Sequence, residues 1–191
     1  MHAGWLRASL TEVCEILDHR RVPVNNRERD RRVAGVRAED LYPYYGSTGQ
    51  VGVIDDFIFD GEHILLGEDG APFLDPLKNK AYLVTGRFWV NNHAHILRAE
   101  ISNKYVCHYL NVVNYSYHVT GTTRLKLTKR SLGSISIPIP SMAEQLRIVA
   151  KIEELFSELD IGIESLKEAS TSMLEKYNRS WFHCAASTNS G

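Results

Sequence analysis

The sequence predicts an α+β protein that combines a mixed domain with a mostly β core and one long C-terminal helix. Short β-prone runs separated by Gly, Asn and Asp occupy the region between about residues 42 and 97. Two prolines and a helix-capping sequence follow near residue 140, and apolar residues then recur at heptad spacing as far as residue 177. We therefore expect a domain over residues 1–140, a helix over 141–183 and a disordered tail over 184–191.

The expected domain begins with a helix and continues mainly as strands. Six apolar residues before residue 20 fall near helical spacing, which predicts a short amphipathic helix. An arginine-rich loop should follow, and a helix over 104–113 and a strand over 134–139 should complete the domain. The strands expected between them cover residues 51–54, 57–59, 63–66, 81–84, 88–90 and 95–97.

The C-terminal helix should begin directly after the prolines, because Ser141 and Glu144 fit the capping box S-x-x-E. At 1.5 Å per residue it would be roughly 60 Å long, which exceeds what a domain of this size can cover. Pairing with a second copy of the helix is favoured, and folding back onto its own domain is the alternative. The expected dimerisation residues are Val149, Ile152, Phe156, Leu159, Ile163, Leu166, Met173 and Tyr177.

Cysteine usage and hydropathy exclude several classes of protein. The three cysteines are far apart and form no CxxC pair, so neither a disulfide framework nor a zinc site is indicated, and reduced cytoplasmic thiols are expected. No signal-peptide pattern opens the chain, and no apolar run approaches the roughly 20 residues that a membrane span needs. We expect a protein that acts in the cytoplasm and does not insert into a membrane.

Charge is distributed in blocks although the formal net charge is only −1. Residues 20–37 contain seven arginines and two acids, residues 38–77 contain nine acids and no Lys or Arg, and residues 101–143 contain five basic residues and no acid. Clustered cations in an acid-free stretch are typical of a surface that binds a polyanion. An ordinary solvated loop is the alternative for each cationic segment.

Two cationic segments and one tyrosine-rich segment are candidates for DNA contacts. Arginines suit phosphate oxygens and guanine edges, and small hydroxyl residues suit phosphate oxygens. Tyrosines beside small hydroxyl residues can reach into a groove, although a tyrosine cluster is more often part of a core. The expected DNA-binding residues are Arg27, Arg29, Arg31, Arg32, Tyr45, Ser47, Thr48, Thr120, Thr122, Thr123, Arg124 and Lys126.

The sequence gives little support for catalysis or for a bound cofactor. Residues 42–49 lack the GK[ST] of a P-loop and the GxGxxG of a dinucleotide site, and no nucleophile elbow is present. Asp60, Glu68 and Asp69 leave open a small metal-dependent nuclease, but turn formation is favoured because no lysine follows them. His93 and His95 could form a metal pair on one side of a strand, but no third ligand is evident. We expect no metal and no cofactor.

Several segments, in this order, resemble the specificity (S) subunits of type I restriction-modification systems. The resemblance extends over about residues 10 to 168, and its segments are specific together although each is weak alone. They are Tyr44-Tyr-Gly-Ser-Thr-Gly49, Asp60-Gly-Glu-His-Ile-Leu-Leu-Gly-Glu-Asp-Gly70, Phe88-Trp-Val-Asn-Asn-His-Ala-His95, Thr120-Gly-Thr-Thr-Arg124 with Leu127-Thr128, and Ile135-Ser-Ile-Pro-Ile-Pro140 leading into Glu144-Gln145.

The resemblance implies a non-catalytic subunit that recognises double-stranded DNA. S subunits usually carry two target-recognition domains separated by long helices, which pair antiparallel and dock methyltransferase (M) subunits. One domain and one helix imply a half-length form, which would dimerise and recognise a bipartite palindrome. Methylation and cleavage, with S-adenosylmethionine and ATP, would belong to the M subunits and to restriction (R) subunits joined through them. A coiled-coil interaction protein without a DNA role is the remaining alternative.

Overall fold

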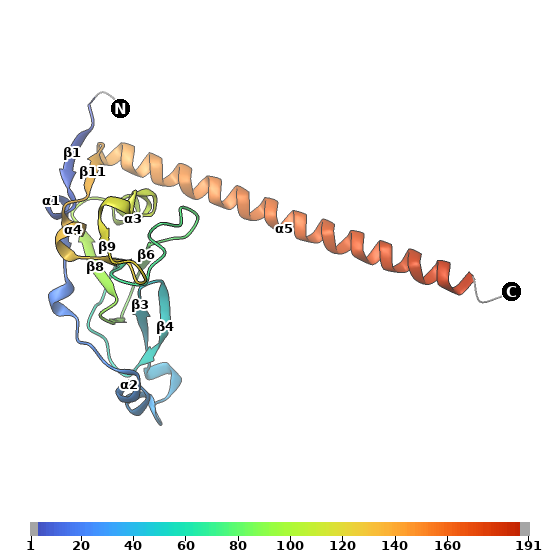
Figure 1. The fold of residues 1–191 in the computed structure, drawn as a ribbon, viewed down its shortest axis with the longest axis horizontal. Coiled ribbons are helices and arrows are strands. Elements are labelled where there is room, and N and C mark those ends of the chain that lie inside the picture. Colours follow the sequence, from blue (N-terminus) through green and yellow to red (C-terminus); the bar gives the residue numbers. More distant parts are fainter. Residues whose placement is uncertain (1–3, 188–191) are drawn as a thin grey trace. The chain divides into compact units, whose positions relative to one another are not determined.

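The structure is a computed structural model that describes residues 4–187, with side chains described as far as residue 177. The chain divides into two compact units, Met1–Leu146 and Arg147–Gly191. The first unit holds all the described strands, the shorter helices and the first turn of helix α5, and the described part of the second unit is the rest of α5 from Arg147 (Figure 1). The predicted α+β class, with a sheet-rich domain and a long C-terminal helix, is confirmed.

The predicted N-terminal helix is wrong, because this segment forms two strands joined by a single helical turn. Strand β1 (Leu6–Ser9) pairs antiparallel with β11 (Ser136–Ile139), and β2 (Cys14–Ile16) pairs antiparallel with β8 (Ala94–Ala99). Between them, α1 (Leu10–Val13) is capped by Glu12, whose carboxylate accepts from the backbone N–H and the hydroxyl of Ser9. Partner strands far away in the sequence thus outweigh the local helical spacing.

The main sheet has the strand order β2-β8-β5-β6 and is antiparallel throughout. Its inner strand β5 (His63–Gly67) is buried at every residue, and β6 (Ala81–Val84) lies at one edge. Helix α3 (Asn103–Val112) packs near that edge, where the Asn111 amide accepts from the N–H groups of Lys80 and Ala81 and donates to the Ala81 carbonyl. Strands β5, β6 and β8 and helix α3 agree with the sequence-based expectations, whereas β2 belongs to the segment that was predicted as a helix.

A second sheet has the order β4-β3-β7 and carries the arginine-rich segment. Strands β3 (Tyr42–Gly46) and β4 (Gly49–Ile54) form a hairpin, and β7 (Trp89–Val90) runs parallel to β3. Strand β3 was not predicted. The strand predicted over 57–59 is reduced to a single bridge between Phe59 and Phe88.

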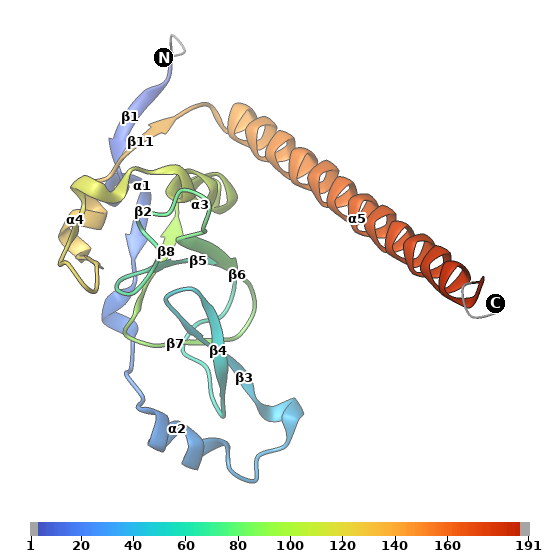
Figure 2. The ribbon, with the colours of Figure 1, turned by 45° about the vertical axis from the view of Figure 1, so that its right-hand side comes forward.

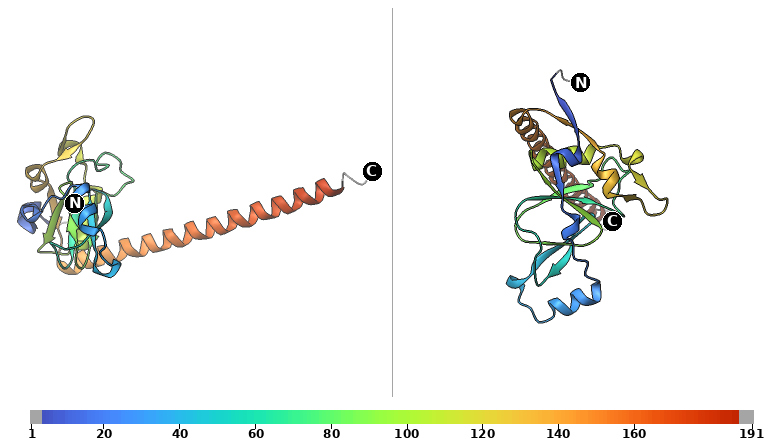
Figure 3. Two further views of the ribbon diagram at one scale, coloured as in Figure 1. Left: turned by 90° about the horizontal axis from the view of Figure 1, so that it is seen from below. Right: turned by 90° about the vertical axis from the view of Figure 1, so that its left-hand side faces the viewer.

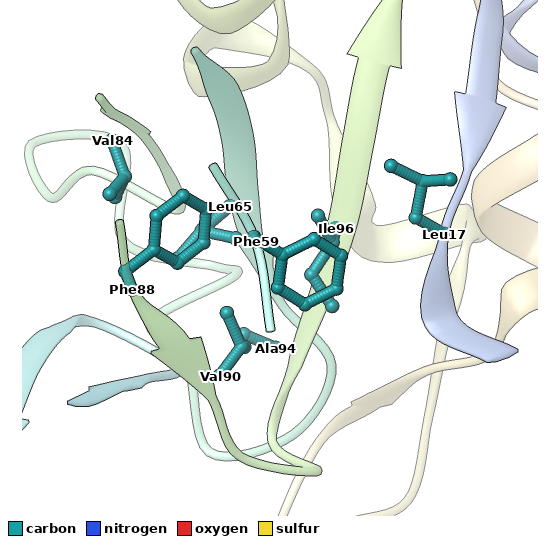
Figure 4. Packing of buried hydrophobic residues seen from close by; sticks show 8 residues of the cluster. All are labelled: Leu17, Phe59, Leu65, Val84, Phe88, Val90, Ala94 and Ile96. Atoms are coloured by element: carbon teal, nitrogen blue, oxygen red, sulfur yellow. The ribbon is translucent and has the colours of Figure 1, made fainter. Parts of the chain in front are cut away.

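The core is built where these two sheets meet. Phe59 and Phe88 stack with ring centroids 5.5 Å apart, and Leu65, Ile96 and Leu17 close around them (Figure 4). A smaller cluster combines Tyr44 of β3, Ile54 of β4 and Trp89 of β7. Burial of these apolar side chains holds the two sheets together and so positions the elements that carry the candidate DNA-binding residues.

The arginine-rich segment forms helix α2 (Asn26–Val33) instead of the expected loop. Its N-cap residue Asn25 accepts a hydrogen bond from the Glu28 backbone at 2.9 Å. The helix lies at the opposite end of the first unit from the β1–β11 pair, as Figures 2 and 3 show. Short 3₁₀ turns precede and follow α2, namely η1 (Asp18–Arg20) and η2 (Ala38–Asp40), and a third, η3 (Tyr115–Tyr117), follows α3.

The last elements of the domain lead directly into the long helix. A small hairpin of β9 (Val119–Thr120) and β10 (Lys126–Leu127) precedes α4 (Lys129–Gly133) and β11. Helix α5 (Met142–Ser187) then begins where it was expected, because the Ser141 hydroxyl accepts from the Glu144 backbone at 3.3 Å. The buried Gln145 fixes this first turn, since its amide accepts from Ser102 N–H and donates to the Pro140 carbonyl.

Helix α5 continues to Ser187, so residues 184–187 are helical although the sequence predicted disorder from residue 184. The rest of that predicted tail, residues 188–191, lies outside the described residues. Among the described helices, none combines the length and the apolar character needed to cross a bilayer.

Candidate nucleic-acid interface

Two of the four candidate arginines on α2 turn toward the protein. The Arg32 guanidinium lies 4.8 Å from the centroid of the Trp89 ring, and its Nε donates to the Asp55 carboxylate at 2.6 Å. The Arg29 guanidinium lies 5.0 Å from the centroid of the Tyr44 ring. Arg32 therefore holds α2 to the second sheet through an ion pair and a ring contact, which is a structural role.

The other two arginines of α2 face solvent. Arg27 and Arg31 are exposed, and within the described part of the chain neither side chain has a hydrogen bond or an ion pair. A cation on a flexible stem at an exposed position suits a phosphate oxygen, which can be reached from many directions. The four arginines, which the sequence did not distinguish, thus form two groups: Arg29 and Arg32 contact aromatic rings of the protein, and the other two face solvent.

A polar groove of about 740 Å³ lies beside α2. It is lined on one side by the segment that enters α2, including Asn25, Asn26 and Arg29, and on the other by the turn Asn91-Asn-His93; Tyr44 also lines it. We call it the α2 groove. None of the residues that line it is acidic, so nothing in the lining opposes a polyanion.

Two partly buried hydrogen bonds hold the walls of the α2 groove. The Tyr44 hydroxyl donates to the Val24 carbonyl at 3.1 Å, and the Trp89 indole N–H donates to the Val22 carbonyl at 3.0 Å. Burial raises the pKa of the Tyr44 hydroxyl, which keeps it protonated and able to donate at neutral pH. The residues that lead into α2 are therefore fixed to the second sheet.

The β9–β10 hairpin carries the second cationic segment and is tied to residues 67–70. Arg124 pairs with Asp69, and the Lys126 ammonium lies 3.2 Å from the Glu68 carboxylate. Backbone hydrogen bonds reinforce these pairs, since the Leu127 N–H donates to the Glu68 carbonyl and the Gly70 N–H donates to the Leu125 carbonyl. The acidic block of the sequence thus positions two candidate DNA-binding cations, both of which stay more than half exposed.

The hairpin and the α2 groove meet at His93. The His93 Nδ1 lies 2.8 Å from the Asp69 carboxylate and 3.3 Å from the Arg124 guanidinium. His93 is also one of the residues that line the α2 groove. The two cationic segments, which are about 90 residues apart in the sequence, therefore belong to one surface.

Beneath this surface lies a buried polar network that the sequence did not reveal. His95 is 1% exposed; its Nδ1 lies 2.6 Å from the Asp18 carboxylate and its Nε2 donates to the Leu127 carbonyl at 2.9 Å. Arg21 donates to the Glu68 carboxylate at 2.6 Å and to the Ala94 carbonyl at 3.0 Å. Through this network η1 and β8 hold both the hairpin and residues 67–70.

The same network bears on the metal and nuclease alternatives. Asp18, Glu68 and His95 lie close enough together to hold a metal ion. However, both His95 nitrogens have hydrogen-bond partners and Glu68 pairs with Arg21 and Lys126, so an ion would have to displace these contacts. His95 is buried on β8 while His93 lies in the preceding turn, so the two histidines do not stand on one strand as the alternative of a metal pair supposed.

The carboxylates of the nuclease alternative have separate partners. Asp60 pairs with Arg87 at 3.3 Å, Glu68 with Arg21, and Asp69 with Arg124. Among the described residues, no group of potential metal ligands contains two of these three acids. The arrangement therefore does not favour that alternative.

The tyrosine-rich candidate segment divides between core and surface. Tyr45 is half-buried and packs on the core, with its ring 5.8 Å from Phe88 and 5.9 Å from Tyr82. Ser47 and Thr48 form the turn of the β3–β4 hairpin, and Thr48 is exposed. A packing role thus accounts for Tyr45, and Ser47 and Thr48 stay candidates for contacts. In the second segment, Thr120, Thr122 and Thr123 are exposed and stay candidates as well.

The candidate dimerisation residues on α5 differ in exposure. Val149 is 5% exposed and Ile152 is half-buried. The remaining six apolar residues leave 42–75% of their surface exposed; they are Phe156, Leu159, Ile163, Leu166, Met173 and Tyr177. The exposed apolar stripe, as we call these six residues, therefore begins at Phe156.

Sequence reasoning missed the residues whose role depends on partners far away in the chain. Asp18, Arg21 and His95 are scattered, and no spacing rule connects them. Asn26 and Asn92, which line the α2 groove, each belong to an Asn-Asn pair, and such pairs are also common in turns. The one available signal was the density of polar residues in Asn91-Asn-His-Ala-His95, which was interpreted as a turn and a possible metal pair.

The chain combines a mixed α+β domain that carries a cationic surface with a long helix that carries an exposed apolar stripe, and such a surface is typical of proteins that bind a polyanion. Residues 3–169 match the family model described as the type I restriction modification DNA specificity domain. Because the match covers most of the chain, the protein belongs to this family.

Individual relatives agree with this assignment. The chain is 32% identical over 148 residues to a putative type I restriction enzyme specificity subunit of Haemophilus influenzae. The aligned region covers 76% of this chain and 36% of that protein. A 25% identity over 116 residues relates it to the type I restriction enzyme EcoprrI specificity subunit of Escherichia coli, covering 60% of this chain and 28% of that protein. The chain thus spans about a third of the length of these relatives.

A solved structure shows the same fold. The S subunit of a type I restriction-modification system from M. genitalium superimposes with a TM-score of 0.63 at 16% sequence identity. The match covers 83% of this chain and 41% of that one.

Proposed function

We propose that this protein is the sequence-specific DNA-recognition subunit of a type I restriction-modification system and has no catalytic role of its own. The observation that carries the proposal is the surface formed by α2, the α2 groove and the β9–β10 hairpin in a chain of the specificity-domain family. Its cations stand on fixed elements, and the acids beneath them are already paired. Such a surface can hold a phosphate backbone while side chains reach base edges.

The proposal extends to a homodimer formed through α5. An apolar stripe of six exposed residues on a helix requires a cover in water, and a second copy provides an identical stripe. A two-fold dimer carries two identical DNA-reading domains, so its DNA site would be a bipartite palindrome. To contact the same face of B-DNA, the two half-sites would lie one helical turn, about 34 Å, or a multiple of that apart.

Partner subunits supply the chemistry in this proposal. Methyltransferase subunits would dock on the dimer and methylate adenine near each half-site, and restriction subunits would join through them. S-adenosylmethionine and ATP would then be bound outside this chain, and the complex would act on DNA in the cytoplasm.

A DNA-binding titration tests the recognition step of the proposal. The purified chain should bind duplex DNA with an affinity that falls steeply as salt is raised, because each phosphate contact releases counterions. A coiled-coil interaction protein without a DNA role would show no such binding. DNA affinity that does not change with salt would contradict the proposed surface.

Truncation tests the dimer. Removal of residues 142–182 should convert the dimer into a monomer in light scattering, because it deletes the exposed apolar stripe. A dimer that persists after this deletion would contradict the role of α5.

A further inference from the structure

Arg29 differs from the other arginines of α2 because its guanidinium is fixed without being neutralised. The guanidinium lies against the Tyr44 ring, and it also packs close to Gly52, where an added Cβ would stand 3.3 Å from the guanidinium carbon. Among the described residues, no carboxylate lies within ion-pair distance of Arg29. Arg29 is one of the residues that line the α2 groove, and the contacts with Tyr44 and Gly52 fix its guanidinium there.

Two amides share this groove with Arg29. The side chains of Asn26 and Asn92 are exposed, and within the described part of the chain neither amide has a hydrogen-bond partner. Asn25 and Asn91, by contrast, are occupied, since their side-chain oxygens accept from the backbone N–H groups of Glu28 and His93. The groove therefore presents one oriented guanidinium and two available amides, with no acid in its lining.

We propose that Arg29 is a specificity-determining residue that recognises a guanine through the α2 groove, with Asn26 and Asn92 facing neighbouring base pairs. This inference rests on the proposed function and deepens it. An arginine fork matches the O6 and N7 acceptors of guanine, and an asparagine amide matches adenine N6 and N7. A phosphate contact needs only a mobile cation, which Arg27 and Arg31 already supply.

Substitution of Arg29 can test whether base recognition needs the planar guanidinium or only its positive charge. Arg29→Lys keeps the positive charge but removes the planar fork, so it should abolish base recognition and preserve attraction to phosphate. Gly52→Ala leaves Arg29 in place but crowds its guanidinium, because the new Cβ would lie 3.3 Å from it. Arg31→Lys makes the same chemical change at an exposed position of the same helix and serves as the control.

The experiment selects random-sequence DNA duplexes with the full chain and sequences the bound fraction. We expect the wild-type protein to enrich a motif that contains one guanine whose preference falls by roughly tenfold to hundredfold in Arg29→Lys. Gly52→Ala should weaken the preference at that position, and Arg31→Lys should leave the motif unchanged. Thermal unfolding of each variant confirms that it is folded.

The outcomes separate this inference from the proposed function. A wild-type motif that Arg29→Lys, folded, reproduces at every position overturns the role of Arg29 and leaves DNA recognition intact. An Arg29→Lys variant that binds every sequence with the same small change in affinity as Arg31→Lys, and keeps the guanine preference, would identify Arg29 as a phosphate contact and also overturns it. A wild-type protein that enriches no sequence overturns the proposed function, and the inference falls with it.

Discussion

Asp18 shows how a single buried side chain positions the candidate DNA-binding surface. It pairs with His95, which in turn holds the Leu127 carbonyl of the β9–β10 hairpin. Burial raises the pKa of the Asp18 carboxyl, but the hydrogen bond and charge of His95, the charge of Arg21 and the Ile96 N–H together hold it below its usual value of 3.8. The ionised carboxylate therefore stabilises the fold.

This lowered pKa predicts a dependence of stability on pH. Because the folded-state pKa lies below the unfolded-state value, the stabilisation is complete above the unfolded-state pKa and is lost as pH falls through the folded-state pKa. Asp18→Asn should cost about 3 kcal/mol of unfolding free energy at pH 7, because it removes the carboxylate charge that faces the buried His95 and Arg21. The variant should also lose less stability than the wild type below about pH 4. Urea unfolding across a pH series measures both effects, and parallel pH curves would contradict the role of Asp18.

Substitution by alanine should have different effects at two arginines of α2, one on DNA binding and the other on stability. Arg27→Ala should leave stability unchanged and reduce the slope of log affinity against log salt by about 1, because one phosphate contact is lost. Arg32→Ala should lower the unfolding free energy by about 1 kcal/mol, because it removes the Asp55 ion pair and the Trp89 contact. Salt-dependent DNA titration and thermal unfolding distinguish the two. A stability loss in Arg27→Ala as large as that in Arg32→Ala would contradict this division.

At the scale of an element, the β9–β10 hairpin depends on Gly121. This residue has φ +95°, and an added Cβ would lie 2.6 Å from the Arg124 carbonyl oxygen. Gly121→Ala should therefore destabilise the hairpin by about 2 kcal/mol and weaken DNA binding. Gly86→Ala is the control, since Gly86 has φ +86° but no atom near the added Cβ. Hydrogen exchange of residues 119–127 measures the effect, and equal protection in the two variants would contradict it.

A charge introduced into the exposed apolar stripe of α5 should change the oligomeric state of the protein. Ile163→Glu places a carboxylate in the exposed apolar stripe and should raise the dimer dissociation constant at least about tenfold, because a charge would be desolvated at the interface. Ser157→Glu adds the same charge on the same helix outside the stripe and should leave the dimer intact. Analytical ultracentrifugation compares the two proteins. Equal dissociation in both would indicate that the stripe is not the interface.

The sequence predicted those elements whose signals are local. Helices α3 and α5 and strands β4, β5, β6 and β8 follow from periodicity and β propensity, and Ser141 marks the start of α5. The N-terminal segment was predicted incorrectly, because its pairing with β8 and β11 is decided more than 80 residues away. The same limit applies to the site. The sequence identified the cations, but the ion pairs that position Arg124 and Lys126 and the groove beside Arg29 form only when the chain folds.

For the whole molecule, the proposed function requires that recognition and pairing act together. The first unit supplies a cationic surface on a rigid core, and α5 supplies the exposed apolar stripe. One domain alone would recognise one half-site, and the dimer would recognise two identical half-sites in inverted orientation. The symmetry of the DNA site thus reports on both parts of the protein.

The most direct test combines the purified chain with the methyltransferase subunit of its system and sequences the methylated DNA. The account predicts methylated adenines in a single bipartite motif whose two halves are inverted repeats. The same motif should lose its guanine preference in both halves when Arg29→Lys replaces the wild-type chain. Methylation at a non-palindromic motif would contradict the homodimer, and methylation that does not depend on this chain would contradict its role in DNA recognition.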